Sequence, residues 1–248
     1  MLKFKFIKLL IAFTIIVAAN SFDYEDLPSI QKGNIANGKK LIVLCIACHG
    51  LRSQNIKAPV NQMASVVAYG VNPPDLSNAG VIYNSKFLVD LMLNPNHAVH
   101  KRLFAMPPLV ATIQDASDIL AYLKSIAPKH IAPKKAFESA CGRCHSLKYA
   151  KWTQIGFIPP TKPNFRTGKN IDLLKFKLDE AKYQDYLTRY LGKLPPDLSE
   201  IVYKYDDNFL EKFIADPKAV KKDTLMLRTG ITKRTYYKII DYLKKVSN

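Results

Sequence analysis

Four cysteines and two histidines carry the clearest chemistry of this 248-residue chain. They form two copies of C-x-x-C-H, at residues 45–49 and 141–145, and no further cysteine is present. Two thiols three residues apart on one helical turn can reach the two vinyl groups along one edge of a porphyrin, and the adjacent histidine can then bind the iron. The spacing therefore predicts two haem c groups, with a zinc site or a thioredoxin-like dithiol as the alternatives. The predicted thioether cysteines are Cys45, Cys48, Cys141 and Cys144, and the predicted proximal ligands are His49 and His145.

A haem iron of this kind takes a second axial ligand, and few side chains can supply it. Met106 precedes Pro107 and Pro108, which hold a loop in extended geometry, so we expect Met106 to be the distal ligand of the first haem. Met226 is the only methionine in the C-terminal half and is the candidate for the second haem. The remaining histidines are His97, His100 and His130, of which His97 or His100 is the alternative to Met106.

An internal repeat supports this assignment. The stretch Pro-Pro-Asp-Leu-Ser at residues 73–77 recurs word for word at residues 195–199, an offset of 122. Met106 and Met226 are 120 residues apart, as are the Tyr-Leu-Lys sequences at 122–124 and 242–244. Met226 therefore occupies the position of Met106. The three remaining histidines have no counterparts in the second half, and we interpret them as surface or linker residues.

The repeat also predicts the domain organisation. Apolar residues at helical spacing indicate closing helices at 115–127 and 233–246, and prolines mark a linker at 127–135. We therefore expect an all-α protein of two tandem domains, residues 28–127 and 128–248. The two C-x-x-C-H motifs are only 96 residues apart, so the second domain carries an insertion at about 150–194 with a helical stretch at 171–190. This insertion either covers a haem edge or docks a partner.

The first twenty residues resemble an export signal. Lys3, Lys5 and Lys8 form a charged region, and the apolar stretch at residues 9–19 ends in small residues at 17–19. An uncleaved anchor is the alternative, although the uncharged run is shorter than the ~20 residues that span a bilayer comfortably. Either arrangement predicts an exported protein in the periplasm, soluble or attached to the outer face of the inner membrane.

Positive charge is concentrated in the second half. Lys and Arg outnumber Asp and Glu by 37 to 20, and the net charge is +5 for residues 1–127 but +12 for residues 128–248. Such a surface can steer an acidic redox protein toward a haem edge. A solvated lysine-rich surface and contact with anionic lipid are the alternatives. Nucleic acid is not an expected partner, because export and haem belong to another compartment.

These residues together resemble known families. Both halves resemble class I cytochrome c domains, over nearly all of the chain after the signal. The second half is similar to cytochrome c1, the haem subunit of quinol–cytochrome c reductase, in residues 141–145 followed by Ser146 and Tyr149, and in residues 195–199 after an insertion. The resemblance implies cytochrome b and Rieske subunits as partners and Met106 and Met226 as distal ligands. It also implies that four prolines line the haem pockets: Pro73, Pro74, Pro195 and Pro196.

Three classes of function follow. The first is an electron-transfer subunit of a quinol–cytochrome c reductase in a periplasmic respiratory chain. The second is a soluble dihaem shuttle of the cytochrome c4 kind, which lacks the long insertion. The third is a dihaem redox enzyme, which needs an exchangeable iron position or a cysteine ligand, and no cysteine is left over. Since no acid–base constellation accompanies the haem ligands, we expect an electron carrier rather than an enzyme.

Overall fold

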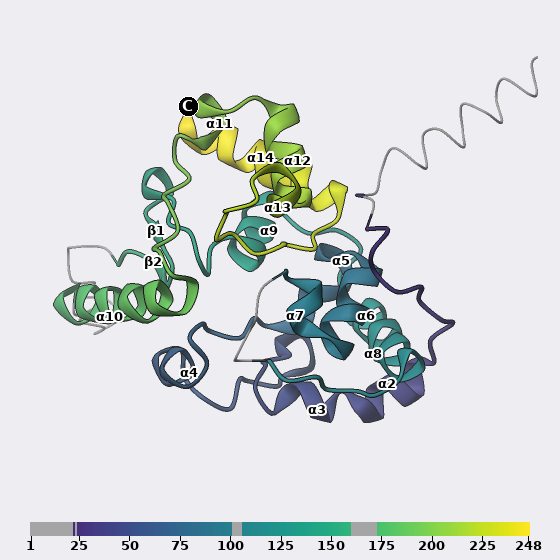
Figure 1. Ribbon diagram of the computed structural model, residues 1–248. Helices are drawn as coiled ribbons and strands as arrows, with labels where there is room; N and C mark the ends of the chain where they lie inside the picture. The colour runs from purple at the N-terminus through teal and green to yellow at the C-terminus, as the bar shows by residue number, and fades with distance from the viewer. Residues whose placement is uncertain (1–21, 23, 101–105, 160–172) are drawn as a thin grey trace, which may run out of the picture.

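The computed structural model describes residues 22, 24–100, 106–159 and 173–248, and within them the chain is mostly helical (Figure 1). The predicted signal or anchor at residues 1–20 lies outside these residues. No helix in the described part is long and apolar enough to cross a membrane. The first-half helices are α2 (Ile35–Leu41), α3 (Val43–Ile46), α4 (Gln62–Tyr69), α5 (Ala79–Ile82), α6 (Ser85–Leu93), α7 (Pro95–Ala98) and α8 (Ile113–Ile126). The second-half helices are α9 (Pro133–Ala140), α10 (Leu173–Leu191), α11 (Ile201–Lys204), α12 (Asp207–Ala215), α13 (Pro217–Val220) and α14 (Lys233–Ser247).

The first half is built on the crossing of α2 and α8. Asn34 caps α2 and Thr112 caps α8, each accepting a hydrogen bond from a backbone N–H of the first turn. Gly38 lies at the crossing, where a Cβ atom would come within 1.9 Å of the Asp118 carbonyl oxygen. Only glycine permits this close approach of the two backbones. The predicted closing helix at 115–127 is confirmed as α8.

The second half repeats this arrangement with α9 and α14. Pro133 occupies the first turn of α9. Ala136 and Phe137 of α9 are buried, and α9 packs against α14. Thr232 caps α14 in the same way that Thr112 caps α8. The predicted closing helix at 233–246 is confirmed as α14. The predicted linker at 127–135 is shorter than expected, because α9 already begins at Pro133 and Ile131 is buried in the core.

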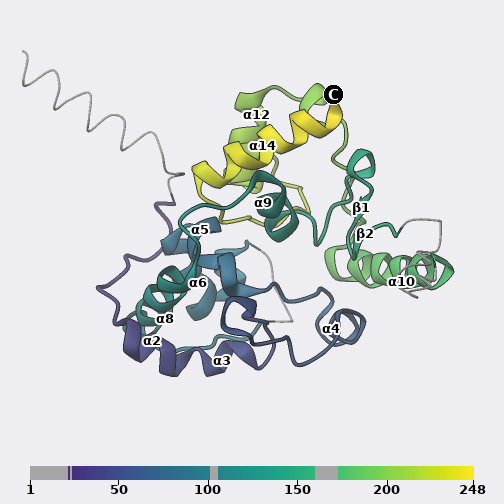
Figure 2. The ribbon, with the colours of Figure 1, turned by 180° about the vertical axis from the view of Figure 1, so that it is seen from behind.

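The elements between these helices also recur in order. Helices α5, α6 and α7 of the first half correspond to α11, α12 and α13 of the second. Asn84 and Asp206 cap α6 and α12, and Pro95 and Pro217 begin α7 and α13. The second-half helices α9, α12 and α14 lie together, beside a group formed by α2, α5, α6 and α8 (Figure 2).

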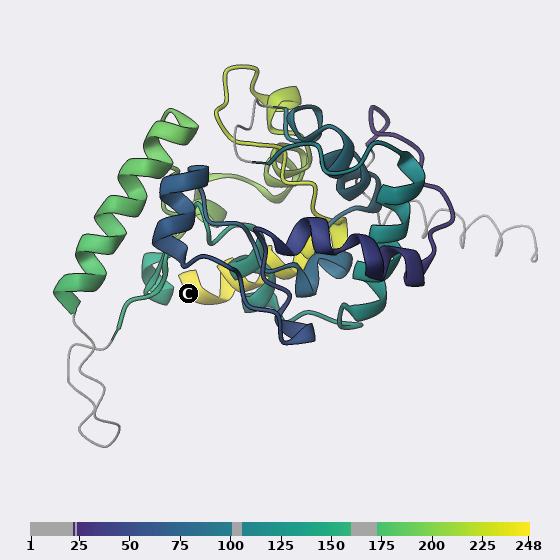
Figure 3. The same ribbon diagram turned by 90° about the horizontal axis from the view of Figure 1, so that it is seen from below.

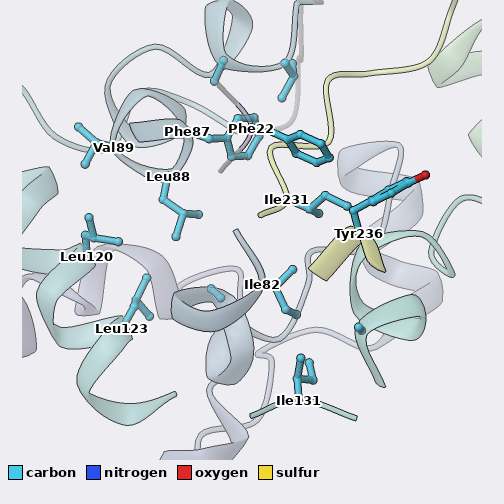
Figure 4. Close-up of a cluster of buried hydrophobic side chains, with 14 of the residues drawn as sticks. Phe22, Ile82, Phe87, Leu88, Val89, Leu120, Leu123, Ile131, Ile231 and Tyr236 are labelled. Atoms are coloured by element: carbon cyan, nitrogen blue, oxygen red, sulfur yellow. The ribbon is translucent and has the colours of Figure 1, made fainter. Parts of the chain in front are cut away.

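Side chains of both halves join in one apolar core. Tyr83 forms an isolated β-bridge with Ile231, and the Asn84 N–H donates to the Gly230 carbonyl at 2.8 Å. Gly230 has φ +63°, and a Cβ there would come within 2.1 Å of the Phe87 ring, so glycine is required on both counts. Phe87, Ile231 and Tyr236 gather at this junction (Figure 4). The loop before α14 is therefore held by the middle helices of the first half.

The segment that follows the predicted signal packs on the second half. Phe22 and Tyr24 are buried, and the Phe22 ring meets the edge of Tyr236 with 5.8 Å between centroids (Figure 4). The Tyr24 hydroxyl donates to the Ile231 carbonyl at 3.3 Å. Phe22 and Tyr24 therefore belong to the second-half core.

The insertion consists of a short hairpin and one long helix. Strands β1 (Trp152–Thr153) and β2 (Gly156–Phe157) form the hairpin, and α10 confirms the helix predicted at 171–190. Tyr183 and Leu187 of α10 are buried against Val66 of α4, and α10 lies beside α4 (Figure 3). Residues 160–172, with Pro160 and Pro163, lie outside the described part. Helix α10 therefore packs against the other half of the same chain.

Candidate haem sites

The first C-x-x-C-H motif begins at Cys45 in the last turn of α3 and continues that turn to His49. The backbone N–H groups of Cys48 and His49 both donate to the Cys45 carbonyl, at 3.1 and 2.9 Å. This turn places both thiols and the imidazole on one short segment, as attachment to a single porphyrin edge requires. All four cysteines of the chain are unpaired, so no disulfide competes for them.

One hydrogen bond orients the ring of His49. Its Nδ1 lies 2.8 Å from the Pro74 carbonyl oxygen, which can only accept, so Nδ1 carries the proton. This tautomer leaves the Nε2 lone pair for a metal ion, and the carbonyl fixes the direction of the ring. Burial lowers the pKa of His49, although the Pro74 hydrogen bond opposes the change. The neutral ring is the form that binds iron.

The second motif has the same geometry. The Cys144 and His145 N–H groups donate to the Cys141 carbonyl at 3.1 and 3.0 Å. His145 Nδ1 lies 2.8 Å from the Pro196 carbonyl oxygen, and burial lowers the pKa of this histidine as well. Both motifs therefore offer two unpaired thiols and an oriented Nε2, which is the donor set that haem c needs.

The repeated Pro-Pro-Asp-Leu-Ser stretches hold the loops that provide these carbonyls. Asp75 Oδ2 accepts a hydrogen bond from the Arg52 N–H at 3.1 Å, just after the first motif. Asp197 Oδ2 accepts from the Lys148 N–H at 3.0 Å, at the matching place after the second. Burial alone would raise the pKa of Asp197, but hydrogen bonds led by Ser146 hold it below its ordinary value. Each carboxylate thus ties a proline loop to its own motif.

The cysteine environment argues against a redox dithiol. A thioredoxin-like pair requires a thiol whose pKa is lowered toward neutrality. Burial instead raises the pKa of Cys45 to about 11 and that of Cys141 to about 12. Both thiols are therefore protonated at neutral pH and unlike the thiolate of a disulfide exchange site.

The two methionines lie in matching loops. Met106 and Met226 are both half-buried and precede α8 and α14 respectively. The loop after Met106 is fixed by the Leu109 N–H, which donates to the Met92 carbonyl at 2.8 Å. The Met226 N–H donates to Thr224 Oγ1 at 3.2 Å. Residues 101–105, directly before Met106, lie outside the described part, and the distal role of both methionines stays a prediction.

Two of the other histidines, His97 and His100, contact carboxylates. His97 Nδ1 lies 2.7 Å from Asp90 Oδ2, and His100 lies within 3.6 Å of both Asp26 and Asp216. Asp216 comes from the second half, so His100 is located between the halves rather than simply at the surface. His130 is exposed, as expected for a linker residue, and meets Arg234 at 2.9 Å.

The structure also brings together residues that the sequence did not single out. Arg143, between the two cysteines of the second motif, donates from Nη1 to the Asn72 carbonyl at 3.0 Å. Tyr183 of α10 donates from its hydroxyl to the Arg143 carbonyl at 3.1 Å. The spacing of the sequence contains no indication of these contacts, because they join the second motif and the insertion to the first-half proline loop.

Comparison with known proteins agrees with the first site. Residues 35–127 match the family model "Cytochrome c", and this segment contains the first motif, Pro73, Pro74 and Met106. The chain therefore contains a cytochrome c domain, a mostly helical domain that binds haem c covalently and carries electrons. A search of curated proteins found no match.

One solved structure, described as "Hyperthermophilic respiratory Complex III", is similar at 24% identity with a TM-score of 0.35. The match covers 47% of this chain and 58% of that chain, so this chain spans little more than half of its length.

Proposed function

We propose that this chain is a dihaem c-type cytochrome with one haem in each of two tandem domains, residues 28–127 and 128–248. The observation that supports the second site is the pair of matched hydrogen bonds, His49 to Pro74 and His145 to Pro196, both at 2.8 Å. Two unrelated C-x-x-C-H sequences would have no reason to share this carbonyl partner.

Each haem has a defined set of residues in this proposal. Haem c supplies an iron that accepts and releases one electron. The histidines would hold it through Nε2, and the proline and methionine loops would line its pocket. The thioether residues are Cys45, Cys48, Cys141 and Cys144; the axial residues are His49, Met106, His145 and Met226; the pocket prolines are Pro73, Pro74, Pro195 and Pro196.

We place the protein in a periplasmic respiratory chain, as a cytochrome c1-like subunit of a quinol–cytochrome c reductase. The c1-like order of motif, insertion and Pro-Pro-Asp-Leu-Ser supports this role, and so does the positive charge of the second half, which suits an acidic redox partner. Cytochrome b and Rieske proteins would then be its neighbours, and the membrane would be reached through them or through residues 1–20.

Two measurements test this proposal. The pyridine haemochrome assay on purified protein should give two haems per chain, and one haem would contradict it. Affinity purification of the native protein from detergent-solubilised membranes should recover a cytochrome b and a Rieske protein. Recovery of all the protein from the periplasmic fraction without either subunit would favour the soluble shuttle instead.

A further inference from the structure

Arg228 places a buried charge in the loop of the predicted distal ligand, two residues after Met226. Its side chain is only 3% exposed. Its Nη2 pairs with Asp26 Oδ2 at 2.8 Å and with Asp216 Oδ2 at 3.3 Å. Its Nε and Nη1 are enclosed and have no hydrogen-bond partner among the described residues. The charge of Arg228 is therefore compensated by these two carboxylates.

The groups that hold Arg228 come from three distant segments. Asp26 belongs to the segment that follows the predicted signal, and the Tyr24 ring of the same segment lies 5.6 Å from the guanidinium carbon. Asp216 is the N-cap residue of α13 in the second half. The backbone N–H of Arg228 donates to the Val99 carbonyl of the first half at 3.1 Å. The loop of the second-half methionine is therefore held from outside its own half as well as from within it.

The matching loop of the first half is held differently. At the offset of 120 that relates the two methionines, the residue matching Arg228 is Pro108. Proline has neither a charge nor a backbone N–H. The loop around Pro108 is held within its own half, where the Leu109 N–H donates to the Met92 carbonyl at 2.8 Å. Dependence on a buried ion pair is therefore a property of the Met226 loop and not of the repeated fold.

Loss of the two carboxylates would leave the cation buried without compensation. Removing one partner of a buried ion pair is far more costly than removing one partner of an exposed pair. The chain can avoid this cost by moving the guanidinium into water, and that movement displaces the loop. Successive Cα atoms are only about 3.8 Å apart, so Met226 would be displaced together with Arg228.

We propose that Arg228 is a positioning residue for the second-half haem, whose ion pairs with Asp26 and Asp216 hold Met226 where it binds the iron. This inference rests on the proposed function, because it requires a haem at the second motif with Met226 as its distal ligand. The segment after the predicted signal then helps to determine whether the second iron keeps its methionine. The first iron has no such dependence, since Pro108 replaces the cation.

The test is a titration of the oxidised holoprotein with imidazole, followed by proton NMR. The paramagnetic iron shifts the methyl signal of a bound methionine out of the ordinary range, and Met226→His assigns the second-half signal by removing it. In Asp26→Asn with Asp216→Asn, we expect imidazole to displace the second-half methionine at a roughly tenfold lower concentration, with the first-half signal unchanged.

The matched control is Asp179→Asn with Asp185→Asn. These carboxylates also pair with cations, at 2.7 Å in each case, but the pairs lie on α10 with the cations 70% and 71% exposed. The control changes the net charge by the same amount as the double variant of Asp26 and Asp216. Both methionine signals should resist imidazole as they do in wild type.

Several outcomes would overturn the inference. It fails alone if wild type shows two haems and two methionine signals, and the double variant of Asp26 and Asp216 leaves the second signal as resistant as before or weakens both signals equally. Wild-type protein with a single haem would overturn the proposed function and this inference together. If the double variant does not mature, Arg228→Lys provides the same readout, since it keeps the charge but loses the fork that reaches both carboxylates. The second-half methionine should then be displaced more easily than in wild type, and an unchanged titration would refute the inference.

Discussion

His49 and His145 show how much one backbone carbonyl does at each motif. A histidine beside two cysteines could rotate, exchange tautomers or become protonated. The proline carbonyl at 2.8 Å removes the first two freedoms, and burial disfavours the third by lowering the pKa of each ring. Each histidine is therefore a neutral imidazole whose ring orientation is fixed and whose Nε2 lone pair is free to bind a metal ion.

The two sites should be separable by mutation of one cysteine pair. Cys141→Ser with Cys144→Ser removes both thioethers of the second motif, and we expect the haem count to fall from two to one. Mass spectrometry and the pyridine haemochrome assay measure this count. The reciprocal variant, Cys45→Ser with Cys48→Ser, is the matched control and should also leave one haem. A count that stays at two in either variant would show that the motif concerned binds no haem.

The distal prediction has its own test in Met226→His. Replacing a thioether with an imidazole ligand lowers the potential of a haem iron. We expect the reduction potential of one haem to fall, with a more than tenfold change in its reduction equilibrium constant, while the potential of the other haem stays the same. Met63→His is a suitable control, because Met63 lies in α4 and is not a predicted ligand. Equal movement of both waves, or of neither, would mean that Met226 does not bind the second iron.

At the scale of elements, Asp118 ties the two crossing helices of the first half. The Asp118 carboxylate accepts hydrogen bonds from the Asn34 N–H at 2.7 Å and from Asn37 Nδ2 at 2.6 Å. These bonds, led by that of Asn37, hold the pKa of Asp118 below its ordinary value. A carboxyl group whose pKa is lower in the folded state stabilises the fold at pH values above its pKa in the unfolded state. This stabilisation is lost as the pH falls through the pKa of the folded state.

Asp118→Asn should therefore destabilise the protein at pH 7 by roughly 1–2 kcal/mol, since an amide turns a donor toward Asn37 and loses the charge-assisted bonds. The difference from wild type should shrink as the pH falls below about 5 and vanish below the folded pKa. Urea unfolding followed by circular dichroism measures both effects. Asp241→Asn, at an exposed position of α14, is the control and should change little. A difference that grew on acidification would contradict the assigned role.

Helix α10 belongs to the insertion, yet its buried face packs against α4 of the first half. Leu187→Ala removes a 0% exposed side chain from its contact region with α4, and such truncations cost about 2–5 kcal/mol. We expect a loss of stability in this range and faster proteolysis within α10, with the haem count unchanged. Leu178→Ala, at a site 53% exposed on the same helix, should change stability by less than about 0.5 kcal/mol. Equal effects would indicate that α10 is not held by its buried face.

For the molecule as a whole, the sequence predicts the helices with regular apolar spacing and the segments that recur in both halves. The closing helices at 115–127 and 233–246 correspond to α8 (Ile113–Ile126) and α14 (Lys233–Ser247), because apolar residues at helical spacing mark both in the sequence. The matching of Pro74 with Pro196 also followed from the repeated stretch. The structure adds the hydrogen bonds to the histidines, which explain why the stretch recurs.

Contacts between distant segments could not be predicted in this way. The bond from Arg143 to Asn72 spans 71 positions and depends on how the halves pack, which no local pattern records. Strands β1 and β2 have two residues each, too few to show a period of two. The lack of a repeat partner predicts a surface or linker position for His100, yet His100 lies near Asp216 of the other half. Such pairings follow from tertiary packing alone.

The net charge of +17 gives a prediction for the molecule as a whole. A positive field attracts anions and repels cations, and salt screens both effects. Oxidation of the reduced protein by ferricyanide should therefore slow by roughly tenfold between low salt and 0.2 M ionic strength. Oxidation by a cationic cobalt complex should accelerate under the same conditions, which makes the pair of reagents an internal control. Stopped-flow measurements would contradict the proposed steering if both rates changed in the same direction, because the surface around the haem edges would then lack a net positive field.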